Sequence, residues 1–184
     1  MKRESKTRYA LLGILSQCEM NGYEIRKYVE TTISFFWNES FGQIYPTLKT
    51  LEEEGLIREF EKKDSNGKSK KVYKITKPGL IEFKNWMESS EIQQNKRNEV
   101  LFKVFFGRHM DRSELIKQLE SQVDRNQKDL LQLDLLRKEL EVDWDNHPDH
   151  RYWKLTLDYA EKLAHLNLEW LSKVRKEVKT TKQD

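Results

Sequence analysis

The sequence predicts a mainly α-helical protein with a small β component. Apolar residues recur every three or four positions near both ends of the chain, while two short segments between them alternate polar and apolar side chains. These patterns predict an N-terminal domain of helices with one β-hairpin, followed by a domain of long helices. We expect the N-terminal domain over 1–88, a polar linker over 89–98, the helical domain over 99–178 and a disordered tail over 179–184.

The charge of the chain is concentrated in its first half. Residues 1–90 hold 16 basic and 13 acidic residues, whereas residues 91–184 hold 18 of each. Seven lysines and one acidic residue lie between Lys62 and Lys77, which predicts a patch that contacts phosphates. The single cysteine, Cys18, excludes intramolecular disulfides, and no apolar run is long enough to span a bilayer. We therefore expect a cytoplasmic protein without membrane contact.

The segment from Phe41 to Ile57 predicts the helix around which the N-terminal domain is arranged. Ile44, Leu48 and Leu51 share one helical face, and Gly55 supplies a left-handed stop after Glu54. Pro46 fits only the first turn, which places the start near Gly42 or Gln43. The opposite face carries side chains that can read base edges or hold phosphate, although an ordinary amphipathic helix with a solvated face has the same pattern. The candidates in and beside this helix are Ser40, Gln43, Tyr45, Thr47, Lys49 and Thr50.

The neighbouring elements favour the DNA-reading interpretation. A helix capped by Thr7 and a second helix over 23–29 precede this segment. After it, 57–62 and 71–76 alternate as strands about a turn at 65–67. Three helices and a basic two-stranded wing form a winged helix-turn-helix, with Lys68, Lys70 and Lys71 at or beside the wing tip.

These residues carry a resemblance to a known family. The segments 40–48 and 51–57 resemble the signature of the PadR family of bacterial transcriptional regulators, and 21–25, 36–37, 72–76 and 78–79 match its landmarks in order. The resemblance implies a homodimer that binds a near-palindromic, double-stranded operator as a repressor. It also implies that the 43–51 helix enters the major groove, with Tyr9 and Tyr23 near the DNA backbone and Lys68 near the wing contact. Gly42 stands at a place where many relatives carry a small polar residue or Gly, and a glycine there implies less side-chain readout.

The C-terminal half has the pattern of a dimerisation domain. An apolar segment over 100–106 precedes a helix over 111–140, whose seam includes Asn126 and Arg137. A last helix carries Leu155, Tyr159, Leu163, Leu166, Trp170 and Val174 on one face. This half resembles the helical domain of regulators of the AphA virulence-activator type. The residues expected at the dimer interface are Phe102, Phe105, Phe106, Leu115, Leu119, Leu130, Leu133, Leu163, Leu166 and Trp170.

The sequence does not favour catalysis or a cofactor. It lacks a phosphate-binding glycine loop, a nucleophile elbow and an HExxH motif. His147 and His150, near several aspartates, allow a metal site, but such residues are also common in loops for turn formation. Aromatic residues of the second half permit a pocket for a small-molecule effector, or they simply form core and interface. A protein-binding adaptor and a small-molecule binding protein without DNA reading are the alternative functions.

Overall fold

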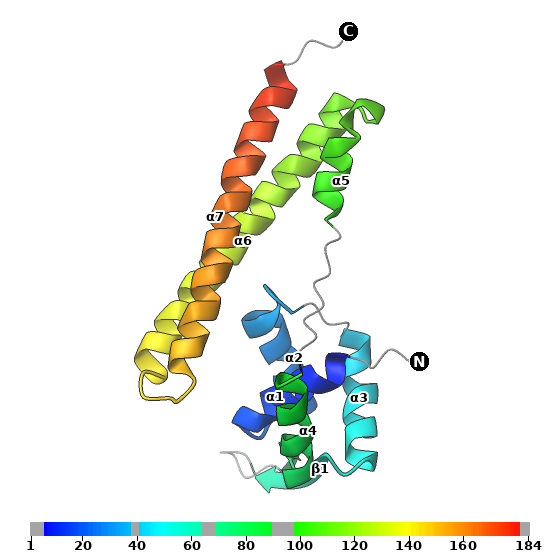
Figure 1. Cartoon of the computed structure of the whole chain (residues 1–184), viewed down its shortest axis with the longest axis vertical. Helices are drawn as coiled ribbons and strands as arrows, with labels where there is room; N and C mark the ends of the chain where they lie inside the picture. The colour runs from blue at the N-terminus through cyan, green and yellow to red at the C-terminus, as the bar shows by residue number, and fades with distance from the viewer. Residues whose placement is uncertain (1–5, 38–40, 64–68, 90–97, 181–184) are drawn as a thin grey trace. The chain divides into compact units, whose positions relative to one another are not determined.

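The computed structural model describes residues 6–37, 41–63, 69–89 and 98–180, and Figure 1 shows its elements. The chain divides into two compact units, Met1–Gln93 and Gln94–Asp184. The expected mainly helical fold with a two-stranded wing is confirmed.

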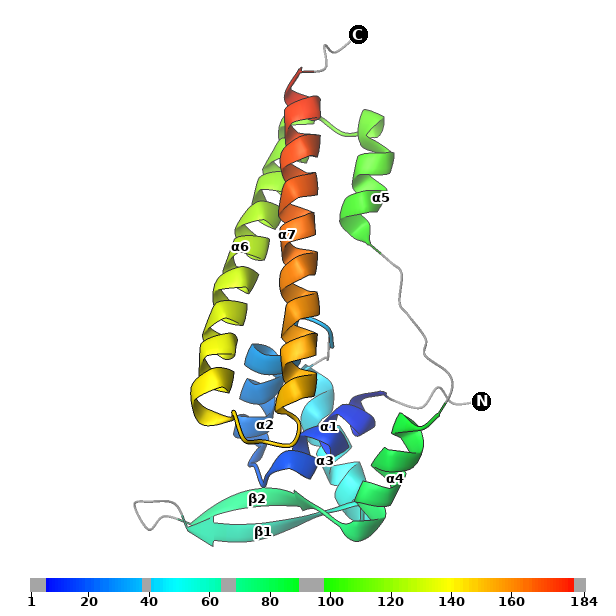
Figure 2. The ribbon, with the colours of Figure 1, turned by 60° about the vertical axis from the view of Figure 1, so that its left-hand side comes forward.

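The N-terminal unit is built on four α-helices and a hairpin. The helices are α1 (Lys6–Gln17), α2 (Gly22–Tyr28), which continues as the π-helical turn η1 (Val29–Ile33), α3 (Phe41–Glu53) and α4 (Lys77–Met87). Figure 2 shows the hairpin at the foot of α3 and α4. The three residues predicted to share the inner face of α3, Ile44, Leu48 and Leu51, are almost fully buried. They pack with α1 residues such as Leu12 and with Ile25 of α2.

Helix α3 ends as predicted and starts earlier than predicted. Gly55 has a φ of 72°, the Leu56 N–H donates to the Leu51 carbonyl at 2.9 Å, and the Gly55 N–H donates to the Glu52 carbonyl at 2.9 Å. These two bonds form a Schellman stop. Because the helix already includes Phe41, Pro46 lies in the second turn and leaves the Gly42 carbonyl without its usual intrahelical donor.

Two other helix starts depend on side-chain caps. Asn21 accepts a bond from the Glu24 N–H while Glu24 accepts one from the Asn21 N–H, each at 2.8 Å, which makes a capping box for α2. Thr76 caps α4 as predicted, with Pro78 in the first turn. Thr7 is not the predicted cap of α1, because the helix includes Lys6 and the Thr7 side chain is buried.

The wing is an antiparallel pair of strands. β1 (Ile57–Lys63) and β2 (Ser69–Ile75) pair so that Ile57 lies opposite Ile75 and Lys63 opposite Ser69. Backbone bonds between Met20 and Tyr73, at 3.3 and 2.8 Å, join β2 to the segment between α1 and α2. This pairing fixes one edge of the wing to the helices.

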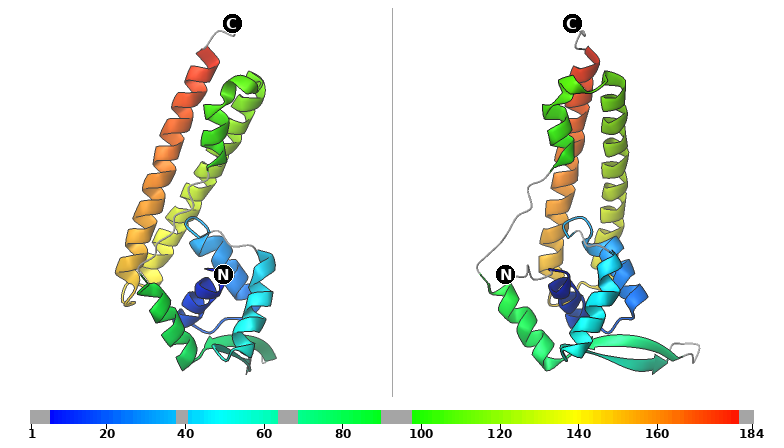
Figure 3. Two further views of the ribbon diagram at one scale, coloured as in Figure 1. Left: turned by 45° about the vertical axis from the view of Figure 1, so that its right-hand side comes forward. Right: turned by 90° about the vertical axis from the view of Figure 1, so that its right-hand side faces the viewer.

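The C-terminal unit is a long helical hairpin with a short helix beside it. It contains α5 (Glu99–Phe105), the short turn η2 (Gly107–His109), α6 (Arg112–Asp143) and α7 (His150–Thr180). Both views of Figure 3 show α6 and α7 side by side. The two polar residues expected in the seam of α6 have partners on α7. Asn126 accepts from Asn167 at 3.2 Å, and Arg137 bonds both carboxylate oxygens of Glu161.

The face of α7 that packs on α6 overlaps only in part, at Trp170 and Val174, with the face that the sequence suggested. Its buried residues are Leu157, Ala160, Ala164 and Leu171, whose small alanines allow close helix approach. Leu155, Tyr159 and Leu166 are about 60 % exposed. Helix α7 therefore has two apolar faces, one of which is left uncovered by the described residues of the C-terminal unit. Because α7 continues to Thr180, the expected tail from 179 is helical for its first two residues, and residues 181–184 lie outside the described residues.

Candidate nucleic-acid interface

The outer face of α3 presents the polar side chains expected of a reading helix. Gln43, Tyr45, Lys49 and Thr50 are exposed, and Thr47 is half-buried. The Thr50 hydroxyl donates to the Pro46 carbonyl at 3.1 Å, so its methyl group is the part left for an outside contact. An amide, a methyl and an ammonium group on one helix face match the chemistry of base edges and phosphates.

Tyr45 is held against the start of α2. A Cβ atom on Gly22 would lie 2.5 Å from the Tyr45 ring, so the glycine permits this close approach. Tyr23, the next residue on α2, is 69 % exposed. Arg26 lies over the Phe41 ring at 5.0 Å and joins α2 to the start of α3. Tyr23 and Tyr45, two of the three tyrosines expected near DNA, therefore lie on neighbouring helices with accessible side chains.

The acidic end of α3 is engaged by the rest of the unit. Arg8 bonds Glu54 at 2.7 Å and Glu82 at 2.6 Å, which ties α1 to α3 and α4. Partial burial opposes the charged guanidinium, but the two carboxylates outweigh it and raise the pKa of Arg8. Glu52 accepts the Glu59 N–H at 3.1 Å. This arrangement favours an approach to DNA by the N-terminal half of α3, where acidic groups are absent from the first turn.

Tyr9, which the resemblance implied near the DNA backbone, is largely buried. Its side chain is only 7 % exposed and stacks on Trp86 with ring centroids 4.6 Å apart. Trp86 in turn meets the edge of Trp37. Tyr9 is a core residue that joins α1 to α4, and its contact with DNA stays a prediction.

The wing lysines are already paired with carboxylates of the same unit. Lys70 bonds Glu24 at 2.7 Å, and Lys71 bonds Glu59 at 2.7 Å. Glu19 receives both Lys62, at 3.2 Å, and Lys74, at 2.8 Å. The sequence count of lysines therefore overstates the free positive charge of the wing. Ser40 and Lys68, also expected at the interface, lie outside the described residues.

These pairs shift the acid–base equilibria of the carboxyl groups. Hydrogen bonds from Lys74 and Lys62 lower the pKa of Glu19, and the bond from Lys71 lowers the pKa of Glu59. Burial alone would raise the pKa of Glu24, but the bonds from Lys70 and from the Asn21 N–H lower it overall. All three carboxylates are thus held in the charged form near neutral pH.

Several apolar side chains of the C-terminal unit are not covered by the described residues of that unit. Of the expected interface residues, Leu115, Leu119 and Leu133 are buried. Trp170 packs against the cluster that contains Leu115 and Leu119. Leu130 is half-buried. The residues that stay open to a second surface are Phe102, Phe105, Phe106, Leu163 and Leu166.

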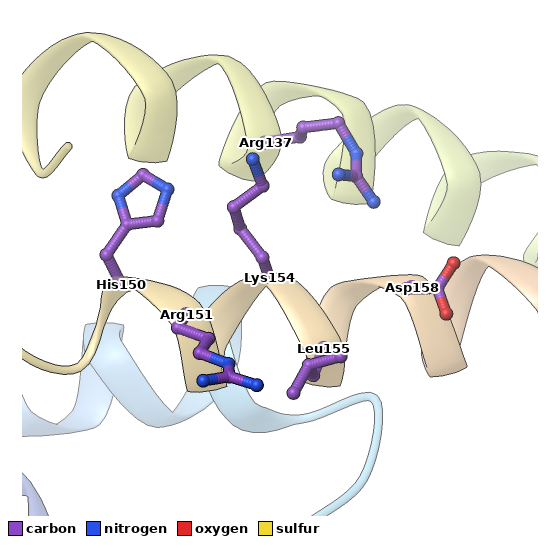
Figure 4. A pocket seen from close by; sticks show the side chains of 6 residues that line it. All are labelled: Arg137, His150, Arg151, Lys154, Leu155 and Asp158. Atoms are coloured by element: carbon purple, nitrogen blue, oxygen red, sulfur yellow. The ribbon is translucent and has the colours of Figure 1, made fainter.

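A shallow cavity of about 520 Å³ lies between α6 and α7 near the turn that joins them. Its lining is rich in basic groups, and Figure 4 shows Lys154 extending from α7 toward Arg137 on α6. Arg137 is paired with Glu161, and Asp158 is paired with Lys162. Of the other lining residues, Arg151 and Lys154 suit an anionic ligand, whereas the His150 Nδ1 bonds the Trp144 carbonyl at 2.9 Å and lies 3.9 Å from Asp145.

The histidine-rich turn is occupied by aromatic packing. The His147 ring stacks on Trp153 at 4.4 Å, and its Nδ1 accepts the Asp149 N–H at 3.1 Å. Across the described ranges, no group of three His, Cys, Asp or Glu side chains is arranged to hold a metal ion. The described helices also include none that is long and apolar enough to cross a membrane.

Each of the two units matches a known protein family. Residues 11–85 match the model of the transcriptional regulator PadR-like family, and residues 96–179 match that of the virulence activator alpha C-terminal domain. The negative transcriptional regulator PadR of Bacillus subtilis is 31% identical over 127 residues, which cover 68% of this chain and 70% of that protein.

Solved structures of the same family are similar over nearly the whole chain. A PadR-like transcriptional regulator from Bacillus cereus has a TM-score of 0.79 at 28% identity, covering 96% of this chain and 100% of that one. Bacillus subtilis PadR in complex with operator DNA has a TM-score of 0.74 at 26% identity, covering 95% and 99%. The same protein in complex with p-coumaric acid has a TM-score of 0.69 at 25% identity, covering 98% and 100%. The Vibrio cholerae virulence activator AphA, at 21% identity, shares the fold with a TM-score of 0.69, covering 94% and 98%. The chain therefore belongs to the PadR-like family of transcriptional regulators, which are not enzymes.

Proposed function

We propose that this protein is a homodimeric repressor that reads a near-palindromic operator with the N-terminal half of α3. The observation that carries the proposal is the outer face of α3, where Gln43, Lys49 and Thr50 are exposed while the opposite face is locked in the core. Such a helix can lay an amide and a methyl group against base edges. The complex of Bacillus subtilis PadR with operator DNA, and the name of that relative as a negative regulator, support it.

Dimerisation would occur through the uncovered apolar face of the C-terminal unit. Tyr152, Leu155, Tyr159, Leu163 and Leu166 follow three- and four-residue steps along α7 and are 38 to 65 % exposed. Phe102 and Phe105 of α5 are further exposed apolar side chains of this unit, 66 and 81 % exposed. A second copy is the occupant that this surface favours, because a twofold axis pairs identical apolar stripes and also presents two identical reading helices to a palindrome.

An anionic effector would act from the cavity between α6 and α7. The basic groups of Arg151 and Lys154, with the apolar side chain of Leu155, form a lining for a small organic acid. The complex of Bacillus subtilis PadR with p-coumaric acid, a carboxylic acid, supports an effector of this class. Release of the operator would require the acid to bind more tightly to a state that does not fit DNA.

The test is fluorescence-anisotropy binding to DNA from immediately upstream of the protein's own gene, against a scrambled duplex of equal length, over a salt series. We expect tighter binding to the upstream DNA and a steep loss of affinity with salt. Gln43→Ala should cost about 1–3 kcal/mol on the upstream duplex only, because an amide contact to a base edge distinguishes sequences. Gln17→Ala, at an exposed glutamine of α1 outside the proposed interface, is the control.

Equal binding to both duplexes would leave two explanations, which a second experiment separates. Selection from a random duplex library should recover one preferred near-palindromic site if the operator simply lies elsewhere. Recovery of no preferred sequence would refute the DNA-reading function and favour a protein-binding adaptor or a ligand-binding protein.

A further inference from the structure

On one face of the wing, basic side chains of β1 lie directly opposite basic side chains of β2. Side chains alternate between faces along a strand, so Lys70 and Lys74 share the face of buried Val72 on β2. The register places Lys62 of β1 opposite Lys70, and Arg58 opposite Lys74. Like charges directly across a strand pair destabilise the pair. This face therefore attracts an anion.

Two carboxylates from outside the sheet provide the negative charge. The Oε1 atom of Glu19 lies 2.8 Å from the Lys74 Nζ, and its Oε2 atom lies 3.2 Å from the Lys62 Nζ. One carboxylate thus bridges the two strands. The Oε1 atom of Glu24 lies 2.7 Å from the Lys70 Nζ, while its Oε2 atom accepts the Asn21 N–H.

The wing is also attached to the helices by contacts that do not involve these charges. The Met20–Tyr73 backbone bonds fix its edge, and Val72 is 1 % exposed in the core. The lysines are 37 to 53 % exposed, and ion pairs of such exposure contribute little to stability. The two carboxylates resemble a phosphate group in chemistry, because each offers negatively charged oxygens to neighbouring ammonium groups.

We propose that Glu19 and Glu24 occupy phosphate-binding positions of the wing, so that the DNA backbone must displace them before Lys62, Lys70 and Lys74 can contact it. The inference rests on the proposed DNA-binding function. The two carboxylates compete with DNA of any sequence and weaken the sequence-independent part of binding. Base contacts by α3 then form a larger share of the affinity that remains.

The competition has a measurable size. Removing the charge of either residue should tighten binding to any duplex by about twofold to fivefold, the factor that corresponds to an exposed ion pair. Each lysine that then holds a phosphate should steepen the slope of log K against log salt by about 0.9. Glutamine is the suitable replacement, because it also serves in a capping box and so preserves the start of α2.

The experiment measures the affinity and salt slope of the wild type, Glu19→Gln and Glu24→Gln on an operator duplex found by selection and on a scrambled duplex. The control is Glu30→Gln, an equally large charge change at an exposed residue of η1 that is not part of these ion pairs. We expect both variants to bind both duplexes more tightly and with steeper slopes than Glu30→Gln does.

Variants that bind like the control, or more weakly than the wild type, would overturn the inference. Failure of the wild type to prefer any duplex would instead refute the proposed function, so the two failures are distinguishable. A double-mutant cycle guards against altered folding. In a Lys62→Gln/Lys74→Gln background, Glu19→Gln should lose its effect, and persistence of the full effect would also overturn the inference.

Discussion

Replacing Leu166 with alanine should weaken the dimer far more than it weakens the fold. Leu166 is 60 % exposed, so a second copy that covers it would bury the larger part of the side chain. Complete burial of a leucine side chain stabilises by about 1.5–3 kcal/mol, and the exposed part by about 1–2 kcal/mol. A twofold axis repeats the contact, which doubles the loss to about 2–4 kcal/mol per dimer. The dimer dissociation constant should rise by about 30-fold to several hundred-fold.

The assay is subunit exchange followed by fluorescence transfer, because interface substitutions act mainly on the dissociation rate. Cys18 is the single cysteine and is exposed, so donor and acceptor dyes can each be attached at one position. Partial burial, together with nearby Glu24, raises the pKa of the Cys18 thiol, so labelling should be done in mildly alkaline buffer, where more thiolate is present.

The control is Ile81→Ala, at a residue of α4 that is also 60 % exposed but belongs to the N-terminal unit. It should exchange at the wild-type rate. The reasoning is refuted if both Leu166→Ala and Phe105→Ala exchange at the wild-type rate, or if the wild type sediments as a monomer at micromolar concentration.

Three further outcomes follow from the structure. Gly79→Ala should lower the midpoint of thermal unfolding, because a Cβ atom would lie 2.1 Å from the Leu56 carbonyl oxygen and force α4 away from it. The control is Gly107→Ala, where the atom nearest to an added Cβ is 3.6 Å away. Equal midpoints for the two variants would contradict the packing of α4 described above. Gly22→Ala should reduce operator affinity more than it reduces stability, because the added methyl group would displace the Tyr45 ring of α3. Anisotropy measures the affinity and calorimetry the stability of the same samples. Unchanged affinity would remove Tyr45 from the proposed interface. Acid should destabilise the wing. Hydrogen bonds from lysine neighbours lower the pKa of Glu19 and Glu59 in the folded state below the unfolded value of 4.5. The stabilisation from these ion pairs is therefore fully present above pH 4.5, and it is lost as the pH falls through the folded-state pKa values. Thermal unfolding between pH 7 and 3 should therefore show a smaller loss for Glu19→Gln than for the wild type, and equal losses would contradict that assignment.

The sequence predicted the elements of the N-terminal unit well, because local signals specify them. Apolar spacing defined the buried face of α3, Gly55 defined its end, and Thr76 defined the start of α4. The start of α3 was placed one or two residues late, because Pro46 is tolerated in the second turn when the helix is held by its buried face.

Long-range contacts were harder to infer. The pairing of wing lysines with Glu19 and Glu24 joins residues 43 to 55 positions apart, and counting charges along the chain cannot show it. The burial of Tyr9 depends on its stacking with Trp86 of α4, which no local pattern records. One of these contacts does have a local sequence signal. Asn21 followed by Glu24 three positions later is the pattern of a capping box, which places Glu24 at the start of α2.

In the C-terminal unit, the large apolar residues of α7 did not predict which face of that helix packs on α6. The sequence drew attention to Leu155, Tyr159 and Leu166, whereas the residues that pack on α6 include the small Ala160 and Ala164. The spacing of Leu157, Ala160, Ala164 and Leu171 is also helical, so a search that counted alanine as apolar would have found both faces.

The measurement that tests the proposed function most directly is a hydroxyl-radical footprint on the duplex that selection recovers. Two reading helices related by a twofold axis should protect two backbone tracts about one helical turn, 34–36 Å, apart, with symmetric patterns in the two half-sites. The same footprint with Gln43→Ala should weaken both tracts together. A single protected tract, or protection that is unaffected by changes in α3, would contradict the dimeric reading of DNA by this helix.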